Sequence, residues 1–502
     1  MPVTASRRVP SWAVLLICCV AQFMVVLDVS IVNVALPQMR HDLGLSVTGQ
    51  QWVVNAYTLT FAGFLMLGGR AADLFGRRRV FLFGLGLFTL CSLVGGLSQN
   101  GTWLVAARAA QGLGGAILAP ATLTLLTSKY TEAHARRRAL GAWSATAASG
   151  AAVGVLLGGI LTQYFDWRWV LFVNVPIGVV LVGASVVVLT DSRDERPVRR
   201  RLDLSGALTI TAGLAAVVYG IVDTDAHPWG SPTTIVALGI GVGLLVAFVA
   251  IEAWFADDPL VDLAVFRRRS LSVANGIAVT LGASLFGMYF FLSLYLQEVA
   301  GYDPLRGGLA FVPAGLSTFA GALVGTRLVA RIGPRRQLIL GPLVGAVGMF
   351  WISTLSLGDG YLAHVLGPLV LVGAGLGLSF VPMTIAATQG VPPGQAGLAS
   401  GLINTTRQMG GAVGLAVMAT VAAGATAHVG RLALPAALTH GYDQAFLISG
   451  CALVAGAALA LVLPRTAGVV PAGRVPDGED ATEPDGETHG GGVPGRVLAA
   501  KH

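Results

Sequence analysis

Long apolar stretches are the feature that most constrains this sequence. A helix needs about 20 apolar residues to cross about 30 Å of hydrocarbon, and fourteen stretches of this kind follow one another along the chain. They span residues 12–36, 51–69, 80–98, 103–127, 139–162, 169–190, 204–222, 233–254, 271–297, 305–329, 337–356, 361–386, 398–425 and 444–463. The sequence therefore predicts an all-α integral membrane protein with 14 transmembrane helices.

The charged residues exclude several other classes of protein. They make up 11% of the chain, against about 25% in a soluble protein, which excludes an ordinary soluble enzyme, a disordered chain and a nucleic-acid binder. No Gly-Lys-Ser/Thr triplet is present, so a P-loop that would drive transport with ATP is also excluded. The four Cys and eight His show no metal-ligand spacing, and we expect no metal and no cofactor.

Basic residues predict the orientation of the chain. With the N-terminus in the cytoplasm, 25 of the 32 Lys and Arg fall on the cytoplasmic side, four fall outside and three lie within helices. Cytoplasmic loops of membrane proteins carry this excess. We therefore expect both termini in the cytoplasm.

A weak internal repeat of a sequence motif predicts that the chain folds as two similar halves. Gly76-Arg77 at the end of the second stretch returns as Gly333-Pro-Arg335 after the tenth, although Ala330 stands where Asp73 stood. Orientation signals alone also produce such loops, but internal repeats are the architecture of secondary transporters. The predicted division is a six-helix half over 1–190, an inserted helix pair over 191–254, a second six-helix half over 255–464 and a disordered cytoplasmic tail over 465–502.

Several motifs together resemble one known family. They are Leu27–Pro37, Gly69–Arg79, Arg108–Ala116, Trp167–Trp169 with Asn174–Pro176, Tyr295–Gln297 with Pro304–Arg306, and Asn404–Gly411. Over about residues 10–465 the chain resembles the major facilitator superfamily and, within it, the 14-helix drug:proton antiporters of the EmrB/QacA type.

The resemblance implies a function as well as a fold. It implies a proton-coupled secondary transporter, not an enzyme, that exports hydrophobic or amphipathic drugs or antibiotics by alternating access. Its partners would be the small-molecule substrate, protons and the lipid bilayer of a bacterial plasma membrane, with no nucleic acid, and it would work as a monomer. A symporter or an exporter of one metabolite on the same fold is the alternative. A membrane-embedded prenyl transferase would need metal-binding acids, and Asp191 and Asp194 lie in an Arg-rich loop instead.

Asp28 and Arg108 are the candidate proton-coupling residues. Asp28 lies about 24 Å into the first helix, where a carboxylate tends to hold a proton or to face a water-filled cavity. Arg108 lies at a comparable depth in the fourth helix. The alternatives are a helix-packing hydrogen bond for Asp28 and a guanidinium that reaches the interface for Arg108. The resemblance implies the proton-coupling role, and our hypothesis is that Arg108 keeps Asp28 charged.

Two further motifs carry expected roles. The resemblance implies a gate in the loop between the second and third helices, formed by Gly69, Asp73, Gly76 and Arg77, although the basic residues also obey the orientation rule. In the fifth helix, the family's antiporter motif is matched by Gly141, Gly150, Gly154, Gly158 and Gly159, with Val155 in place of Pro. Gly150, Gly154 and Gly158 share a smooth face, and we expect this face to form a dry contact between the two halves.

The candidate substrate cavity combines aromatic, amide and guanidinium side chains, and the aromatic ones suit bulky amphipathic molecules. For each of them, core packing or a local hydrogen bond is the alternative. We also expect Asp28 to be the only acid well inside a helix. The candidate cavity residues are Asn33, Gln111, Tyr289, Tyr295, Asn404 and Arg407.

Overall fold

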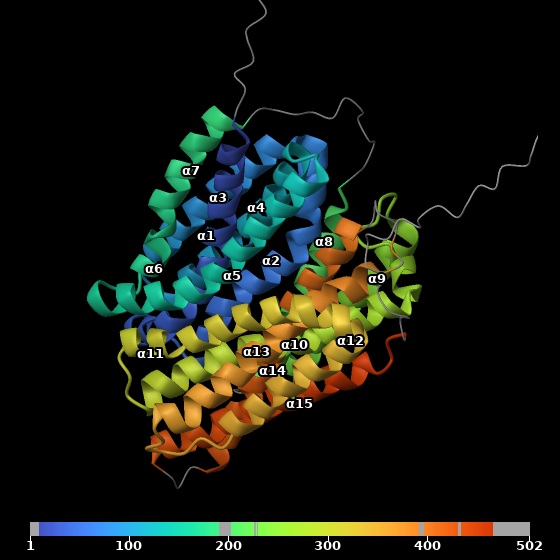
Figure 1. Cartoon of the computed structure of the whole chain (residues 1–502). Coiled ribbons are helices and arrows are strands. Elements are labelled where there is room, and N and C mark those ends of the chain that lie inside the picture. Colours follow the sequence, from blue (N-terminus) through green and yellow to red (C-terminus); the bar gives the residue numbers. More distant parts are fainter. Residues whose placement is uncertain are drawn as a thin grey trace, which may run out of the picture. The chain divides into compact units, whose positions relative to one another are not determined.

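The computed structural model describes residues 10–189, 202–224, 227, 229–389, 391, 396–429 and 433–464, and every regular element in these ranges is a helix (Figure 1). The first seven helices are α1 (Ser11–Leu43), α2 (Val47–Phe75), α3 (Arg77–Gly96), α4 (Gly101–Lys129), α5 (Ala133–Tyr164), α6 (Trp169–Phe172) and α7 (Asn174–Val188). The next are α8 (Leu204–Asp223), α9 (Pro232–Ala250), η1 (Ile251–Phe255), η2 (Leu263–Arg267), α10 (Arg269–Leu294) and η3 (Tyr295–Val299). The last are α11 (Pro304–Ala310), α12 (Val312–Ile352), η4 (Leu362–Leu366), α13 (Gly367–Thr388), α14 (Ala396–His428) and α15 (Leu434–Ala460).

Twelve helical segments of the described chain are long and apolar enough to cross a membrane. One of them, Pro304–Ile352, is 49 residues long and contains a break at Gly333, where the backbone leaves the helical region with φ 79° and ψ 161°. In α5, the apolar part is the shorter segment Ala152–Tyr164. The prediction of an all-α membrane protein is thus confirmed. The predicted number of fourteen transmembrane helices is not confirmed by these twelve segments.

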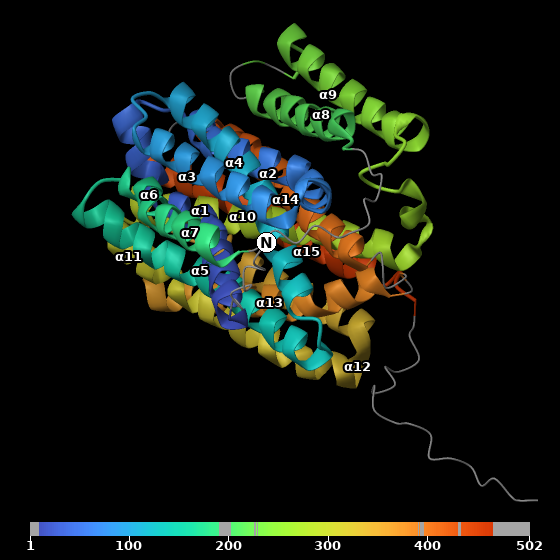
Figure 2. The ribbon, with the colours of Figure 1, turned by 90° about the horizontal axis from the view of Figure 1, so that it is seen from above.

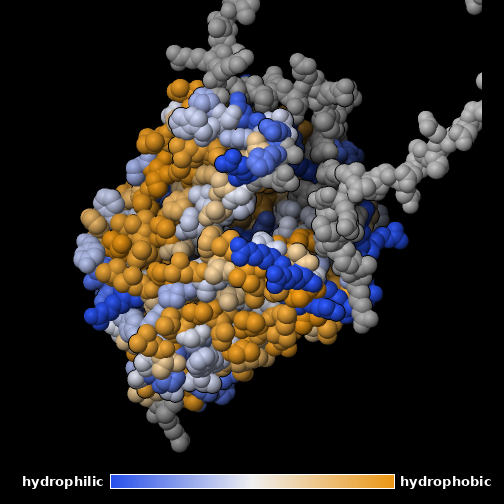
Figure 3. All heavy atoms as spheres, in the orientation of Figure 1, coloured by the Kyte–Doolittle hydropathy of each residue, from blue (hydrophilic) through white to orange (hydrophobic). Residues whose placement is uncertain are grey.

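The surface of the helices is apolar, as lipid contact requires. Val179, Val180 and Val187 of α7 are exposed, as are Val242 and Val246 of α9. Figure 3 shows apolar side chains over most of the visible helix surface. A soluble protein rarely exposes apolar patches of this extent, so these faces belong against hydrocarbon.

The helices pack in two groups. Within the first, α1 contacts α4, α5 and α7, and α4 contacts α2 and α3. Within the second, α10 contacts α14 and α15, and α12 contacts α13 and α15. Helices α8 and α9 pair with each other (Figure 2), and α8 also contacts α2 and α14. The groups meet where α2 packs on α14 and α5 packs on α11.

The predicted boundaries of the halves remain a prediction. The predicted linker around residue 191 falls within 190–201, and the predicted tail is 465–502. Both lie outside the described residues, as does the N-terminal segment 1–9.

One helix boundary overturns an expectation. Helix α15 begins at Leu434, ten residues before the predicted start at 444. Tyr442 and Ala445 are buried, and this packing extends the helix through the polar residues that precede 444. Asp443 therefore lies inside a helix. The expectation that Asp28 is the only acid well inside a helix is wrong.

The tight turns that carry the echoed motif depend on glycine. Gly76 joins α2 to α3 with φ 95°, and Gly333 breaks α12 with φ 79°. A side chain at such a positive φ costs about 1–3 kcal/mol of backbone strain. The motif repeated in the sequence thus corresponds to the same positive-φ backbone conformation at Gly76 and at Gly333.

We predict that Gly333→Ala lowers the stability of the protein by about 1–3 kcal/mol, because the strained φ, and not a clash, opposes the new methyl group. No atom lies within 4 Å of the place a Cβ would take there. Thermal unfolding in detergent measures the change. Gly239→Ala in α9, which also has open space but an ordinary helical φ, is the control. Equal melting temperatures for the two variants would contradict the prediction.

Candidate functional site

A buried ion pair joins α1 to α4. Arg108 Nη1 lies 2.6 Å from Asp28 Oδ2, and the two side chains are 2% and 0% exposed. Gln111, one helical turn beyond Arg108, donates from Nε2 to Asp28 Oδ1 at 2.8 Å. Its Oε1 accepts from Arg108 Nη1 at 2.7 Å. The three side chains thus form a closed triangle in the middle of the first helix group.

Two more helices contribute side chains that the sequence analysis did not assign. Asn174, near the start of α7, donates from Nδ2 to Asp28 Oδ1 at 2.9 Å. Ser92 of α3 accepts from Asn174 and from Gln111, and donates to the carbonyl of Leu171 at 2.8 Å. Asn174 belongs to a motif noted in the sequence, and an amide within an apolar stretch was the signal that could have placed it here.

Helix α2 closes the network over the guanidinium. The Tyr57 ring lies 4.3 Å from Arg108 Cζ, a cation–π contact. Arg108 Nε also donates to the carbonyl of Val53 at 3.3 Å. The charge on Asp28 is therefore matched by one cation and two amide side chains, Gln111 and Asn174, and such pairing is what lets a charge stay buried.

The network revises one predicted cavity residue. Gln111 is buried at 1% exposure, and its amide is used within the network. The prediction that Gln111 lines the substrate cavity is therefore wrong for the conformation seen here. Its amide has no unused face for a ligand.

The glycines of α5 lie closer to α1 than predicted. A Cβ on Gly150 would lie 3.1 Å from the Phe23 carbonyl oxygen, one on Gly154 2.8 Å from that of Leu27, and one on Gly158 2.8 Å from that of Ile31. The prediction that this face joins the two halves is wrong, because α1 belongs to the same group. The face instead lets α5 pack tightly on the helix that carries Asp28.

Gly159 and Gly141 differ from these three glycines. A Cβ on Gly159 would lie 2.6 Å from the carbonyl oxygen of Pro304 in α11, so Gly159 is the motif glycine that reaches the second group. No atom lies within 4 Å of a Cβ on Gly141. Val155, in place of the motif's proline, is buried, and its carbonyl oxygen faces Gly308 of α11.

The two helix groups are tied together at one end, which we call the closed end: the C-terminal end of α1 with η3 and α11. Arg40 Nη1 pairs with Glu298 Oε1 at 3.2 Å, and Tyr442 donates to Glu298 at 3.4 Å. Ser293 and Gln297 donate to the carbonyls of Asn33 and Val34, both at 3.0 Å.

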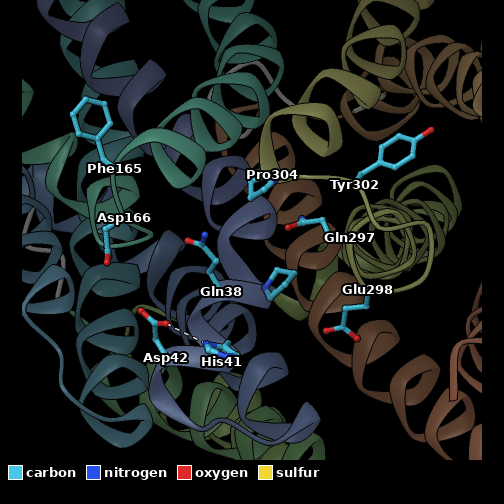
Figure 4. Close-up of a pocket in the computed structure, with 10 residues that line it drawn as sticks. Gln38, His41, Asp42, Phe165, Asp166, Gln297, Glu298, Tyr302 and Pro304 are labelled. Atoms are coloured by element: carbon cyan, nitrogen blue, oxygen red, sulfur yellow. Dashed lines mark ion pairs between the residues drawn. The ribbon is translucent and has the colours of Figure 1, made fainter.

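A pocket of about 450 Å³ lies at this closed end (Figure 4). Its lining comes from both helix groups, with Gln38 and Asp42 from the first and Gln297, Glu298 and Tyr302 from the second. The pocket is polar and does not reach Asp28. It is therefore a feature of the closed end and not a chamber around the ion pair.

The predicted cavity residues divide between the two ends. Asn33 donates to the Val29 carbonyl of its own helix, and Tyr289 stacks on Phe311 with centroids 5.2 Å apart. Tyr295 donates to the Ser356 carbonyl at 3.0 Å. These three are held by protein contacts toward the closed end.

Asn404 and Arg407 lie in the half of α14 away from the closed end. Arg407 donates to Asn404 Oδ1 at 3.2 Å, and its Cζ lies 5.5 Å from the Phe380 ring centroid of α13. Asn404 is exposed, and Gly401 beside it has no atom within 4 Å of a Cβ position. Asn404 Nδ2 also donates to the Ser400 carbonyl at 3.2 Å, so contacts within α13 and α14 hold both side chains.

The predicted gate lies between α2 and α3. Gly69 is in α2 with Pro120 of α4 3.7 Å from its Cβ position, and Gly76 forms the turn described above. Asp73 and Arg77 flank this turn. Their gating role stays a prediction, as does the proton-coupling role of Asp28 and Arg108.

Comparison with known proteins identifies the family. Residues 18–415 match the family described as "Major Facilitator Superfamily". The chain belongs to the Major Facilitator Superfamily. This facilitator is therefore a membrane transporter and not an enzyme. The alternative of a membrane-embedded prenyl transferase is excluded.

Individual relatives agree with the family assignment. The facilitator is 43% identical to the cephamycin export protein CmcT of Amycolatopsis lactamdurans over 93% of its own length and 96% of that protein. It is 41% identical to the puromycin resistance protein pur8 of Streptomyces alboniger, over 90% and 91% of the two chains. The crystal structure of a bacterial homologue of the lysosomal transporter Spinster, inward-facing and occupied, matches with a TM-score of 0.63 at 15% identity, over 91% and 97% of the chains. At that identity the match supports the fold alone.

We predict that Arg108→Met destabilises the facilitator by about 3–5 kcal/mol, because it leaves Asp28 charged, buried and without its cation. The double variant Asp28→Asn with Arg108→Met should recover much of that loss. Unfolding in mixed detergent micelles measures both. Arg306→Met is the control, since its ion pair with Asp303 is exposed and such pairs contribute about 0–1 kcal/mol. Additive losses in the double variant would contradict the prediction.

We predict that Gly154→Ala destabilises this facilitator by about 1–3 kcal/mol, because the added methyl group overpacks the α5–α1 contact. Gly141→Ala, in the same helix and the same motif, should not destabilise it, because its Cβ position is open. Melting temperatures of the two variants in the same detergent measure the difference. Equal losses would show that the close contact with α1 is absent.

Proposed function

We propose that this transporter exports amphipathic antibiotics across the bacterial plasma membrane in exchange for protons. The observation that carries the proposal is the fully buried Asp28 carboxylate, held by Arg108, Gln111 and Asn174. The chain's relatives named for antibiotic export or resistance, CmcT and pur8, support the direction of transport.

The proposed coupling follows from the pairing of the network. When Asp28 is charged, its ion pair with Arg108 joins α1 to α4. A proton on Asp28 removes that attraction, so the guanidinium keeps only Val53, Gln111 and the Tyr57 ring as partners. The cost of a buried, unpaired cation then favours a conformation in which water reaches Arg108. Protonation would thus change the relative stability of the transporter's conformations.

We propose that the closed end faces the outside of the cell and that the chain crosses the membrane fourteen times, with both termini in the cytoplasm. The excess of basic residues in alternate loops supports this orientation. The count follows if the 49-residue segment Pro304–Ile352 crosses twice with its turn at Gly333 and if α5 crosses once. The conformation described here would then be inward-facing, with the loop at Gly76 on the cytoplasmic side as a gate.

The proposed substrate would enter beside α13 and α14. Asn404, Arg407 and Phe380 offer an amide, a cation and an aromatic face in one place. Such a surface suits bulky amphipathic molecules. One proton moving down about 100 mV supplies about 2.3 kcal/mol, enough for a substrate gradient of roughly 50-fold.

Export of a single metabolite, or symport, is the second candidate. Val155 favours it, because the family's antiporter motif has a proline at this position. The same fold serves both directions of coupling, so transport measurements must separate them.

The test is transport by the reconstituted protein under an imposed pH gradient. Puromycin, lincomycin and ethidium serve as solutes in separate assays. We expect gradient-dependent export by the wild type, and we expect Asp28→Asn to reduce it to the rate of protein-free liposomes. Asp303→Asn, which changes an exposed carboxylate, is the control and should transport normally.

The contrary outcomes are distinct. Export that Asp28→Asn leaves unchanged would place the proton site elsewhere. Uptake in the direction of the proton flow would establish a symporter. Transport of none of the solutes would overturn the proposal of a broad drug exporter and favour the exporter of one metabolite.

A further inference from the structure

Two buried carboxyl groups lie where α8 begins and where α9 ends. Asp203 precedes α8 and is 8% exposed, and Glu252 lies in η1 after α9 and is 5% exposed. Helices α8 and α9 pack against each other, and the start of α8 contacts η1, which follows α9. Neither residue belongs to the network of Asp28.

One oxygen of each carboxyl group is fully used. Asp203 Oδ1 accepts from the Gly206 backbone N–H at 2.7 Å and from the Ser205 hydroxyl at 2.7 Å, and so caps α8. Glu252 Oε2 accepts from the Val261 N–H at 2.8 Å. These bonds fix both side chains in place.

The other two oxygens face each other without a donor. Asp203 Oδ2 and Glu252 Oε1 are buried and have no hydrogen-bond partner. A Cβ placed on Gly206 would lie 2.5 Å from the first and 2.6 Å from the second. The two oxygens are therefore within about 5 Å of each other. Two ionised carboxylates at that separation, both out of water, repel strongly.

We propose that Asp203 and Glu252 bind one proton between them, as a carboxylic acid that donates to a carboxylate. A single proton removes the repulsion and supplies the missing donor, and hydrogen bonds of this kind are short and strong. This proton site is separate from Asp28 and goes beyond the proposed export.

A metal ion fits the site less well. Calcium takes six to eight oxygen ligands and magnesium about six, whereas the pair offers two free oxygens. No cluster of three or more His, Cys, Asp or Glu that could hold a metal occurs among the described residues.

The pair connects the inserted helices to α2. Arg70 donates to the carbonyls of Asp258 and Pro259, in the segment whose Val261 N–H binds Glu252. Arg70 lies next to Gly69 of the predicted gate. The charged groups around the pair in the described chain are thus Arg70 of α2 and the acids of this connecting segment, Asp257, Asp258 and Asp262. Loss of the proton would separate the start of α8 from η1 and loosen this connection.

The sign of the pH dependence follows from proton counting. In the unfolded chain both carboxyl groups are ionised at neutral pH, whereas the folded pair keeps one proton. Stability therefore falls as the pH rises through the range in which the pair releases its proton. The slope is at most about tenfold in the unfolding equilibrium per pH unit.

Infrared spectra of the reconstituted full-length protein in H₂O and ²H₂O at neutral pH test the proposal. Exposed carboxyl groups are ionised there, so a protonated C=O band that shifts in ²H₂O reports a buried acid. We expect Glu252→Gln and Asp203→Asn each to remove the same band. The amide in each variant keeps an oxygen for the backbone bond that the carboxyl group accepted.

The controls separate this site from the export mechanism. Asp28→Asn and Asp262→Asn, the latter an exposed cap of η2, should leave the band intact. Glu252→Gln and Asp203→Asn each test the proposal independently, so the test still works if one of the two variants does not fold. A band of wild-type area in the variant would overturn the proposal, whatever the outcome of the export assay. So would a wild-type melting temperature that falls no more than that of Glu252→Gln between about pH 7 and about pH 9.

Discussion

The buried attraction between Asp28 and Arg108 is the interaction on which the first helix group depends. A carboxylate and a guanidinium withdrawn from water must find all their partners within the protein. Five helices meet this demand, since α1 and α4 supply the charges, α3 and α7 supply Ser92 and Asn174, and α2 supplies Tyr57. In the proposed coupling, a proton on Asp28 would leave Arg108 without its counter-charge.

Glycine determines how closely the helices around that network approach. Gly150, Gly154 and Gly158 bring α5 onto α1, the helix that carries Asp28, while Gly159 brings α5 onto α11 of the second group. Helix α5 thus contacts both α1 and the closed end. A shift of α1 that follows a change at Asp28 would therefore be felt at the contact between the two groups.

Charged contacts are distributed unevenly along the bundle. The Arg40–Glu298 pair ties the groups at the closed end, whereas Asn404 and Arg407, away from that end, bond to each other within α14. Near the second end, Arg70 links α2 to the segment held by Glu252. Helices α8 and α9 are thereby attached next to the predicted gate at Gly69 and Asp73, a part of the chain that the proposed alternating access would move.

The sequence by itself determined the class of the protein, because burial of about 20 consecutive apolar residues in lipid requires a helix whatever its neighbours are. It also determined the family, through motifs of fixed spacing, and it singled out Asp28 and Arg108, because a charge in an apolar stretch is costly. Only the tertiary structure decided that the two side chains touch, that Asn174 and Ser92 complete their network, and that the α5 glycines face α1. It alone paired Asp203 with Glu252, and it placed Asp443 inside α15. Contacts between residues far apart in the chain depend on how helices rotate and pack against one another, and helical periodicity along one segment leaves those rotations undetermined.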